Sequence, residues 1–288
     1  MILVNNPSPL RYPGGKSKFY PVIRGILHLN DLLGTTYIEP FAGGAGLALR
    51  LLLAGDVRRI VINDFDPHIY AFWYAILNHT DRFCERLLNT PVTVDEWDRQ
   101  KAIYAVCDIT ALFNLGFATF FLNRTNVSGV LTGGIIGGRN QQGDFKINAR
   151  FPKDDLVKKI NAIAARKTDI TVINADASKL LGHPALRDSK GTFVNFDPPY
   201  VSKGAQLYRN SFSKQDHIAF AQTVKHCRRK WIVTYDVAPL ILQTYSRYRI
   251  GFLDVSYSAG EQKTAQEYII FGRDLVIPES IVRANELK

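Results

Sequence analysis

Five short apolar runs in this chain are each followed within three residues by an acidic residue, and this pattern restricts the fold more than any other feature. The runs are rich in β-branched and aromatic residues, which indicates buried strands. Segments with helical periodicity separate them, so we expect a doubly wound, mostly parallel α/β sheet. Such sheets bind ligands at the carboxyl ends of their strands. The runs are Thr35–Ile38, Arg59–Ile62, Ile170–Ile173, Thr192–Val194 and Trp231–Thr234, and the acids after them are Glu39, Asp64, Asp176, Asp197 and Asp236.

The first of these acids begins a glycine-rich loop, Glu39-Pro-Phe-Ala-Gly-Gly-Ala-Gly46, between a predicted strand and a predicted helix over Leu47–Ala54. Asp64 follows Gly43 by about twenty residues, the distance at which an acid reaches a ribose hydroxyl in nucleotide-binding βαβ units. The loop lacks the Gly-x-Gly-x-x-Gly pattern, and Glu39 would repel a diphosphate, so NAD and FAD are disfavoured. A ligand with a ribose, an ammonium group and no phosphate fits better, and S-adenosylmethionine is such a ligand.

A second glycine-containing stretch, residues 5–18, is basic and rich in proline. Its Pro13-Gly14-Gly15-Lys16 segment allows close approach of the backbone to a ligand and places an ammonium group beside it. It is not a Walker phosphate loop, which has a longer gap before its lysine and follows a strand. We therefore expect Lys16 near a ligand without assigning it to a nucleotide phosphate.

The stretch Asn195-Phe-Asp-Pro-Pro-Tyr200 stands where the fourth apolar run ends. Two consecutive prolines fix φ and remove two backbone N–H groups, so the loop is rigid and its carbonyls lack local donors. A carboxylate, a free carbonyl and an aromatic ring could together bind a flat amino-heterocycle. A capped strand end with a Pro-Pro turn is the alternative that these residues alone leave open.

Residues 123–150 differ in composition from the rest of the chain, with six glycines, four asparagines, two glutamines and a single acid. We expect an exposed loop or β-hairpin there. Because the net charge is +10, and because Asn, Gln and Arg side chains can pair with base edges, we expect this segment to contact nucleic acid. A solvated glycine-rich loop is the alternative. The side chains expected at DNA are Asn123, Arg124, Asn126, Arg139, Asn140 and Lys146.

Other features exclude several classes of protein. The cysteines Cys84, Cys107 and Cys227 are far apart, so neither a disulfide framework nor a metal site is expected. The first residues do not resemble a signal peptide, and no apolar run is long enough for a membrane span. A cytoplasmic protein without a membrane partner is expected.

Taken in order, the four motifs resemble those of the Dam-like family of DNA adenine-N6 methyltransferases, over nearly the whole chain. The motifs are Tyr12-Pro-Gly-Gly-Lys16, Glu39-Pro-Phe-Ala-Gly-Gly-Ala-Gly46, Asn63-Asp64 and Asp197-Pro-Pro-Tyr200. The resemblance implies a Rossmann-like methyltransferase sheet with an inserted, mainly helical target-recognition domain that carries a β-hairpin. It assigns residues 1–68 and 166–288 to the catalytic S-adenosylmethionine-binding domain and residues 69–165 to the DNA-binding insertion.

The family's residue roles carry over to matching positions of this sequence. The catalytic loop is Asp197, Pro198, Pro199 and Tyr200, and the residues implied at the cofactor are Tyr12, Lys16, Glu39, Phe41, Gly43, Gly46, Asp64, Asp176 and Asp197. Asp176 is the weaker match. The spacing of Tyr208, Phe212 and His217 after the catalytic loop is also similar to the family. The partner implied is double-stranded DNA, the expected state is a monomer, and a cognate restriction endonuclease acting separately is compatible with the resemblance.

The chemistry of the loop agrees with this resemblance. The exocyclic N6 of adenine is a poor nucleophile because its lone pair is delocalised into the ring. The Asp197 carboxylate and the Pro198 carbonyl could each accept one N6–H and localise that lone pair, with the adenine flipped out of the duplex and stacked on Tyr200. Three alternatives stay open: methylation of cytosine N4, methylation of adenine in RNA, and a DNA-binding protein with an inactive methyltransferase fold.

Overall fold

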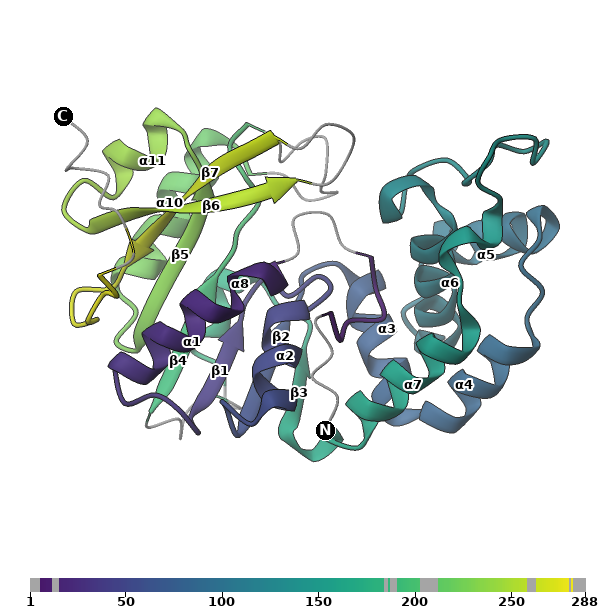
Figure 1. Ribbon diagram of the computed structural model, residues 1–288, viewed down its shortest axis with the longest axis horizontal. Coiled ribbons are helices and arrows are strands. Elements are labelled where there is room, and N and C mark those ends of the chain that lie inside the picture. The colour runs from purple at the N-terminus through teal and green to yellow at the C-terminus, as the bar shows by residue number, and fades with distance from the viewer. Residues whose placement is uncertain are drawn as a thin grey trace.

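The structure is a computed structural model that describes residues 6–11, 16–183, 186, 191–202, 212–257, 263–279 and 281. Figure 1 shows a twisted sheet with its flanking helices on one side of the molecule and a group of helices on the other. Among the described residues, no helix is both long enough and apolar enough to cross a membrane.

The sheet has seven strands in the order β3-β2-β1-β4-β5-β7-β6. Strands β1 to β5 are parallel to one another, and β7 runs antiparallel to both β5 and β6. The predicted mostly parallel α/β sheet is therefore confirmed. The strands are β1 (Thr36–Glu39), β2 (Arg59–Asn63), β3 (Ile170–Ile173), β4 (Thr192–Phe196), β5 (Lys230–Asp236), β6 (Arg249–Tyr257) and β7 (Lys263–Phe271).

The edge strand β6 was not expected from the sequence. Gly251 and Asp254 interrupt its apolar pattern, whereas the paired strand β7 contains the apolar run Tyr268–Phe271. β6 is paired along its whole length with β7, from Arg249 opposite Phe271 to Tyr257 opposite Lys263. Its pairing partner, rather than its own composition, therefore accounts for this strand.

Alternate residues of the central strands pack into two apolar clusters, one on each face of the sheet. Tyr37 and Phe193 belong to one cluster, and the residues after them, Ile38 and Val194, belong to the other. This alternation is the consequence of the two-residue period of a strand. Helices α1 (Tyr20–Leu29) and α2 (Gly46–Ala54) cover the first face; α8 (Ala177–Leu180), α10 (Lys214–Lys225) and α11 (Pro239–Thr244) cover the second.

The remaining helices form a helical lobe built around α6. Phe72, Phe83, Phe117 and Phe120 are fully buried and in ring contact within it. Gly116 lets α6 pack closely on α3, because a Cβ there would lie 2.3 Å from the carbonyl oxygen of Ala71. The lobe contains α3 (Pro67–Asn78), α4 (Thr80–Asn89), α5 (Val94–Val106), α6 (Leu112–Thr125) and α7 (Lys153–Ala164).

The apolar core of this lobe is continuous with the core under α1 and α2. The lobe therefore packs directly on the sheet domain instead of being joined to it by a linker. The domain boundaries at residues 68/69 and 165/166 stay predictions, and helix α3 begins at Pro67, before the first of them.

The β-hairpin expected within residues 123–150 is absent from the described structure of that segment. A single antiparallel bridge joins Asn126 to Ile135, and two short 3₁₀ turns, Val127–Gly129 and Ile147–Arg150, precede and follow the loop. The Gln141 side chain organises the loop by donating to the carbonyls of Ile136 and Gly138 and accepting from the N–H of Ile147. These side-chain bonds take the place of a strand ladder, so the loop alternative is the one observed.

Candidate functional site

The predicted acids converge on the carboxyl edge of the sheet, where the strand order reverses between β1 and β4. β1 pairs with β2 on one side and with β4 on the other. The chain leads from β1 to β2 on one side of this point and from β4 to β5 on the other. Such a reversal opens a crevice at the strand ends of an α/β sheet. Glu39 ends β1, Asp64 follows β2 and Asp197 follows β4, so all three lie at this position.

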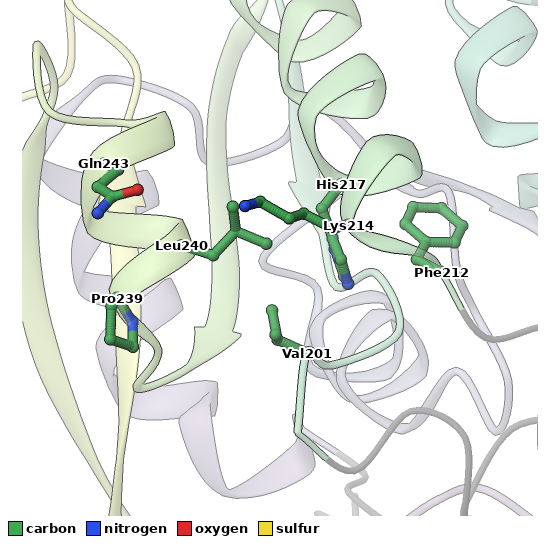
Figure 2. Close-up of a pocket in the computed structure, with 7 residues that line it drawn as sticks. All are labelled: Val201, Phe212, Lys214, His217, Pro239, Leu240 and Gln243. Atoms are coloured by element: carbon green, nitrogen blue, oxygen red, sulfur yellow. The ribbon is translucent and has the colours of Figure 1, made fainter.

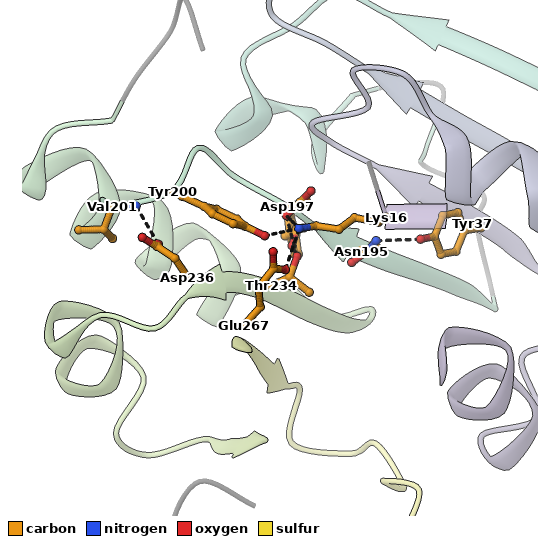
Figure 3. Close-up of polar contacts among 10 residues, drawn as sticks. Lys16, Tyr37, Asn195, Asp197, Tyr200, Val201, Thr234, Asp236 and Glu267 are labelled. Atoms are coloured by element: carbon orange, nitrogen blue, oxygen red, sulfur yellow. Dashed lines mark hydrogen bonds and ion pairs between the residues drawn. The ribbon is translucent and has the colours of Figure 1, made fainter. Parts of the chain in front are cut away.

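Asp197 is held through one of its two carboxylate oxygens (Figure 3). Its Oδ1 accepts a hydrogen bond of 2.7 Å from the Thr234 hydroxyl and lies 3.3 Å from the Lys16 ammonium. Neither Asp197 Oδ2 nor the Pro198 carbonyl has a hydrogen-bond donor among the residues that the structure describes. Two adjacent acceptors are thus left for a ligand.

Burial raises the pKa of Asp197, and the ammonium of Lys16 opposes that rise. Lys16 is itself only 9% exposed and also donates to Glu267 Oε2 at 2.8 Å. It further bonds to the Tyr200 hydroxyl and lies 4.7 Å from the centre of that ring. A single buried cation therefore connects the catalytic loop to β7.

The loop that carries Asp197 is fixed from the neighbouring strand end by Asp236. The two carboxylate oxygens of Asp236 accept the backbone N–H groups of Val201 and Ser202, at 2.9 and 2.8 Å (Figure 3). Because both prolines of the loop lack N–H groups, few backbone donors are available between Asp197 and these two residues. Asp236 therefore positions the loop.

Glu39 is buried, and its Oε1 accepts the backbone N–H of Ala48 in the first turn of α2 at 3.1 Å. Burial raises the pKa of Glu39 to about 8, and the negative charge of Asp197 contributes to the rise. A buried carboxyl with this pKa favours a cationic partner, which would stabilise its ionised form.

The glycine loop that follows Glu39 is closely packed. Ala45 has a left-handed backbone with φ of 45°. Gly46 faces Ser17 so closely that a Cβ there would lie 2.3 Å from the Ser17 hydroxyl oxygen. Gly46 therefore permits the Lys16–Phe19 turn to pack against the start of α2.

Asp64 is half-buried and joined to the glycine loop. Its Oδ2 accepts the N–H of Gly43 at 2.8 Å, and its Oδ1 accepts the N–H of Asp66 at 3.0 Å. Burial raises the pKa of Asp64 to about 6, and these two N–H groups oppose the rise. Each oxygen keeps a further lone pair for a hydroxyl ligand.

The fully buried Asn63 holds three loops of this edge together. Its amide donates to the carbonyls of Pro40 and Ala175 and accepts the N–H of Ala175, at 2.8, 3.0 and 3.0 Å. Asn63 thus sets the spacing between the loops that follow β1, β2 and β3, a role that its position in the sequence did not reveal.

Three other expected cofactor residues have different surroundings. Asp176 is exposed and caps α8 by accepting the N–H of Ser178 at 2.7 Å. Phe41 is half-buried and packs edge-on against Phe220 and Phe212. Tyr12 lies outside the described residues, as does Tyr208.

A pocket of about 390 Å³ lies beside the catalytic loop (Figure 2). His217 is 2% exposed within its wall, and its Nδ1 lies 3.1 Å from the Tyr235 hydroxyl. The His217 Nε2 is buried and has no hydrogen-bond partner among the described residues. The wall consists of Val201, Phe212, Lys214, His217, Pro239, Leu240 and Gln243.

Two of the side chains expected at DNA are fully buried. Asn123 accepts the N–H of Arg11 at 2.7 Å and donates to the carbonyls of Arg11 and Gly129. Asn126 accepts from the Trp97 indole and donates to the carbonyls of Val130 and Leu131. In this structure both amides bind protein groups instead of facing a DNA groove.

The other four expected DNA residues are divided between the surface and the interior. Arg139 is exposed and forms a two-bond ion pair with Asp98, at 2.9 and 2.7 Å. Asn140 and Lys146 are exposed on the same loop, whereas Arg124 is only 9% exposed. The structure therefore does not bring all six residues onto one surface.

Comparisons with known proteins identify the family to which the chain belongs. The sequence profile of the family described as D12 class N6 adenine-specific DNA methyltransferase matches residues 12–258. The type II methyltransferase M.MjaIII of Methanocaldococcus jannaschii is 25% identical over 226 residues, 72% of this chain and 73% of that protein. The type II methyltransferase M1.LlaDCHI of Lactococcus lactis subsp. cremoris is 20% identical over 280 residues, 89% of this chain and 90% of that protein. The solved rRNA methyltransferase aviRa of Streptomyces viridochromogenes superposes with a TM-score of 0.37 and 14% identity, over 90% of this chain and 86% of that chain.

Proposed function

The chain belongs to the D12 class N6 adenine-specific DNA methyltransferase family, and we propose that S-adenosylmethionine is its methyl donor and binds at the carboxyl ends of β1, β2 and β4. The family membership gives the reaction as methylation of adenine N6 in DNA. The donor supplies a methyl group that is electrophilic because it is bonded to a sulfonium. The residues of this chain bind the donor, orient the adenine amino group and accept its proton.

The acids of the glycine-loop region fit this donor. Glu39 provides a buried carboxyl with a raised pKa for the α-ammonium group, and Asp64 has lone pairs for the ribose hydroxyls. Gly43 and Gly46 hold the loop in the conformation that connects these acids. The set contains cation and hydroxyl acceptors, which suits a donor that carries no phosphate.

The two unused acceptors of the catalytic loop fit the N6 amino group of adenine, and this observation carries the proposal. Asp197 Oδ2 and the Pro198 carbonyl would each accept one N6–H, which localises the lone pair on nitrogen. The nitrogen is then able to bond to the transferred methyl carbon, and Asp197 is placed to take up the proton that N6 loses. Positioning and electrostatics suffice, without a covalent enzyme intermediate.

The target adenine must leave the duplex to reach this loop. Tyr200 is buried, with its hydroxyl bonded to Lys16. We propose that the base lies against this ring, on the side of Asp197 Oδ2. The names of the two curated relatives also support a site-specific enzyme of the type II kind, which acts on the same short sequence as a separate restriction endonuclease.

The test is methylation-sensitive long-read sequencing of DNA from methylation-deficient cells that express the chain. The intact protein is expected to produce N6-methyladenine at one short sequence motif. The Asp197→Ala variant is expected to produce none while still binding S-adenosylmethionine in a calorimetric titration. Full methylation by Asp197→Ala would refute the assigned mechanism, and unmethylated DNA from cells with the intact protein would refute the proposed substrate.

A further inference from the structure

We propose that Arg11, Arg124, Arg150 and Lys159 form a binding site for one backbone phosphate of the substrate DNA. The inference rests on the proposed function, because it takes DNA as the substrate. It adds a site on the side of the helical lobe that faces the N-terminal segment, and it does not involve the exposed loop around Arg139.

The four cations come from four separate segments of the chain. Arg11 ends the described N-terminal segment 6–11, which Figure 1 shows in purple between the sheet and the helical lobe. Arg124 lies in the last turn of α6, Arg150 in the 3₁₀ turn Ile147–Arg150, and Lys159 in α7. Their convergence is a property of the fold, not of sequence proximity.

The protein binds three of these cations through backbone carbonyls instead of acids. Arg11 donates to the carbonyl of Asn126 at 3.1 Å, Arg124 to that of Pro9 at 3.5 Å, and Lys159 to that of Ser8 at 3.3 Å. Within the described part of the chain, no ion pair involves any of the four. The positive charge of the cluster is therefore not neutralised by the described residues.

Arg124 gives the most direct indication of an absent anion. It is only 9% exposed, and its Nε is buried without a hydrogen-bond partner among the described residues. An unpaired buried donor on a charged group is costly, and an anion that accepted from it would remove the cost. The oxygens of a phosphate suit guanidinium groups, which bind them through parallel hydrogen bonds.

The electrostatic environment agrees with this arrangement. Burial lowers the pKa of Arg124 to about 10, and the neighbouring charges of Arg11 and Arg150 contribute to that lowering. Burial and Arg124 also lower the pKa of Lys159, with Asp155 acting weakly in the opposite sense. Asp155 itself lies 3.9 Å from the ammonium of Lys158. An anion among the four cations would relieve their mutual repulsion.

Two buried contacts fix Arg11 in the cluster. The Asn123 side chain binds both the N–H and the carbonyl of Arg11, at 2.7 and 2.8 Å. Gly129 lies against the same carbonyl, where a Cβ would approach to 2.3 Å. The backbone of Arg11 is thus held on α6 before any ligand binds, as expected for a preorganised site.

The number of residues between Arg11 and Lys16 limits how far the bound phosphate lies from the target adenine. Arg11 precedes Lys16 by five residues, so their Cα atoms are at most about 18 Å apart. Lys16 contacts Asp197 directly. At about 3.4 Å of rise per base step, the cluster lies within about five steps of the adenine at the catalytic loop. A backbone phosphate within about five base steps of the target nucleotide therefore fits, and one at a distant site does not.

The test compares the salt dependence of DNA binding among variants of the full chain. Fluorescence anisotropy with a labelled duplex would give Kd between about 50 and 200 mM KCl, a range in which phosphate contacts have large effects. Arg150→Gln and Lys159→Gln are the informative variants, because Arg150 is exposed and Lys159 half-buried. Lys158→Gln is the matched control: it removes one charge from the same helix, next to Lys159, at a side chain that is 79% exposed.

In the double variant Arg150→Gln/Lys159→Gln, loss of the shared phosphate contact is expected to reduce the slope of log Kd against log salt by about one. Binding of the same variant in 100 mM KCl is expected to be about tenfold weaker than that of the wild type. The Lys158→Gln slope is expected to equal that of the wild type. Equal slopes for all variants, from a wild type that binds and methylates DNA, would overturn this inference and leave the proposed function standing. A wild type that neither binds nor methylates DNA would overturn both.

A second measurement uses inorganic phosphate as the probe. Phosphate is expected to raise the unfolding temperature of the wild type and of Lys158→Gln above that found in chloride at equal ionic strength, and to raise that of the double variant less. General salting effects act on all three proteins alike, so they cancel in the comparison. An equal rise in all three proteins would count against the site.

Discussion

Binding of S-adenosylmethionine should release a proton at neutral pH, and Glu39 should be its source. Burial raises the pKa of this carboxyl to about 8 in the free protein, so about 0.9 of a proton is bound there at pH 7. The donor's α-amino group, with an ordinary pKa near 8, is also about 0.9 protonated. The complex needs an ionised carboxylate and a protonated amine, which together hold one proton. The expected net release at pH 7 is therefore about 0.8 of a proton.

The sign of this proton exchange should reverse with pH. At pH 9 the free carboxyl and the free amine hold only about 0.2 of a proton between them, so binding must take up about 0.8. Release and uptake balance near pH 8, which is also where affinity should be greatest. Asp64 changes this result little, because with a pKa of about 6 it is about nine-tenths ionised at pH 7.

The assay is isothermal titration of the protein with S-adenosylmethionine at pH 6.5, 7, 8 and 9, each in two buffers of different ionisation enthalpy. The control is Glu39→Gln, which lacks the titrating group and should take up about 0.1 of a proton at pH 7. Its affinity should fall by about ten- to a hundredfold, because a hydrogen bond to a charged group contributes about 1.5–3 kcal/mol. Proton release of equal size in wild type and Glu39→Gln would refute the assignment of Glu39 to the ammonium group.

Three further predictions concern the residues around the catalytic loop. Lys16→Met should lower the free energy of unfolding by about 3–5 kcal/mol in urea titration, because it removes the cation that Asp197 and Glu267 share. Adding Glu267→Gln should restore part of that loss. No restoration would contradict the shared ion pair. Asp236→Ala should lower kcat about ten- to a hundredfold without changing the Kd of S-adenosylmethionine more than about twofold. The control is Asp274→Ala, because Asp274 is exposed. An equal loss of kcat in both variants would show that the loop does not depend on Asp236. Gly46→Ala should weaken binding of S-adenosylmethionine. Ser17→Ala should rescue it, because the new Cβ would then meet only atoms at ordinary contact distance, the position-17 Cβ at 3.7 Å and the Asn6 Oδ1 at 3.9 Å. Failure of the rescue would place the clash elsewhere.

The sheet and its line of acids could be predicted from the sequence because both depend on local patterns. A short apolar run rich in β-branched residues favours a strand, and an acid within a few residues of its end lies near the strand's carboxyl end. This argument places Glu39, Asp64 and Asp197 correctly at one edge. It did not place Glu267, which precedes the last apolar run instead of following one. Glu267 reaches the same edge because β7 is antiparallel and pairs Glu267 with Asp236, and strand direction is a property of the whole sheet.

The amides of the glycine-rich segment show what could not be predicted from the sequence. Composition suggested that Asn123 and Asn126 face DNA, because exposed asparagines in a basic protein can read base edges. Both side chains instead satisfy buried backbone groups of the segments around them. A buried loop backbone needs such partners, and a sequence does not show which loop will be covered. The cluster around Arg124 was hidden for the same reason, since its four cations lie up to 148 positions apart along the chain, from Arg11 to Lys159.

The position of Lys16 bears on two opposing influences on Asp197, its need to be ionised and its burial. Asp197 must stay ionised to accept hydrogen bonds from the amino group of adenine, yet its burial raises its pKa. A buried cation at 3.3 Å opposes that rise. Paired with Asp197 alone, however, the cation would compete with the amino group for the carboxylate. Glu267 lies closer to the ammonium, at 2.8 Å, and Lys16 contacts only the Oδ1 side of Asp197. Burial and the charge of Glu267 raise the pKa of Asp197, and the Lys16 ammonium opposes this rise from the Oδ1 side, which leaves Oδ2 available to the substrate.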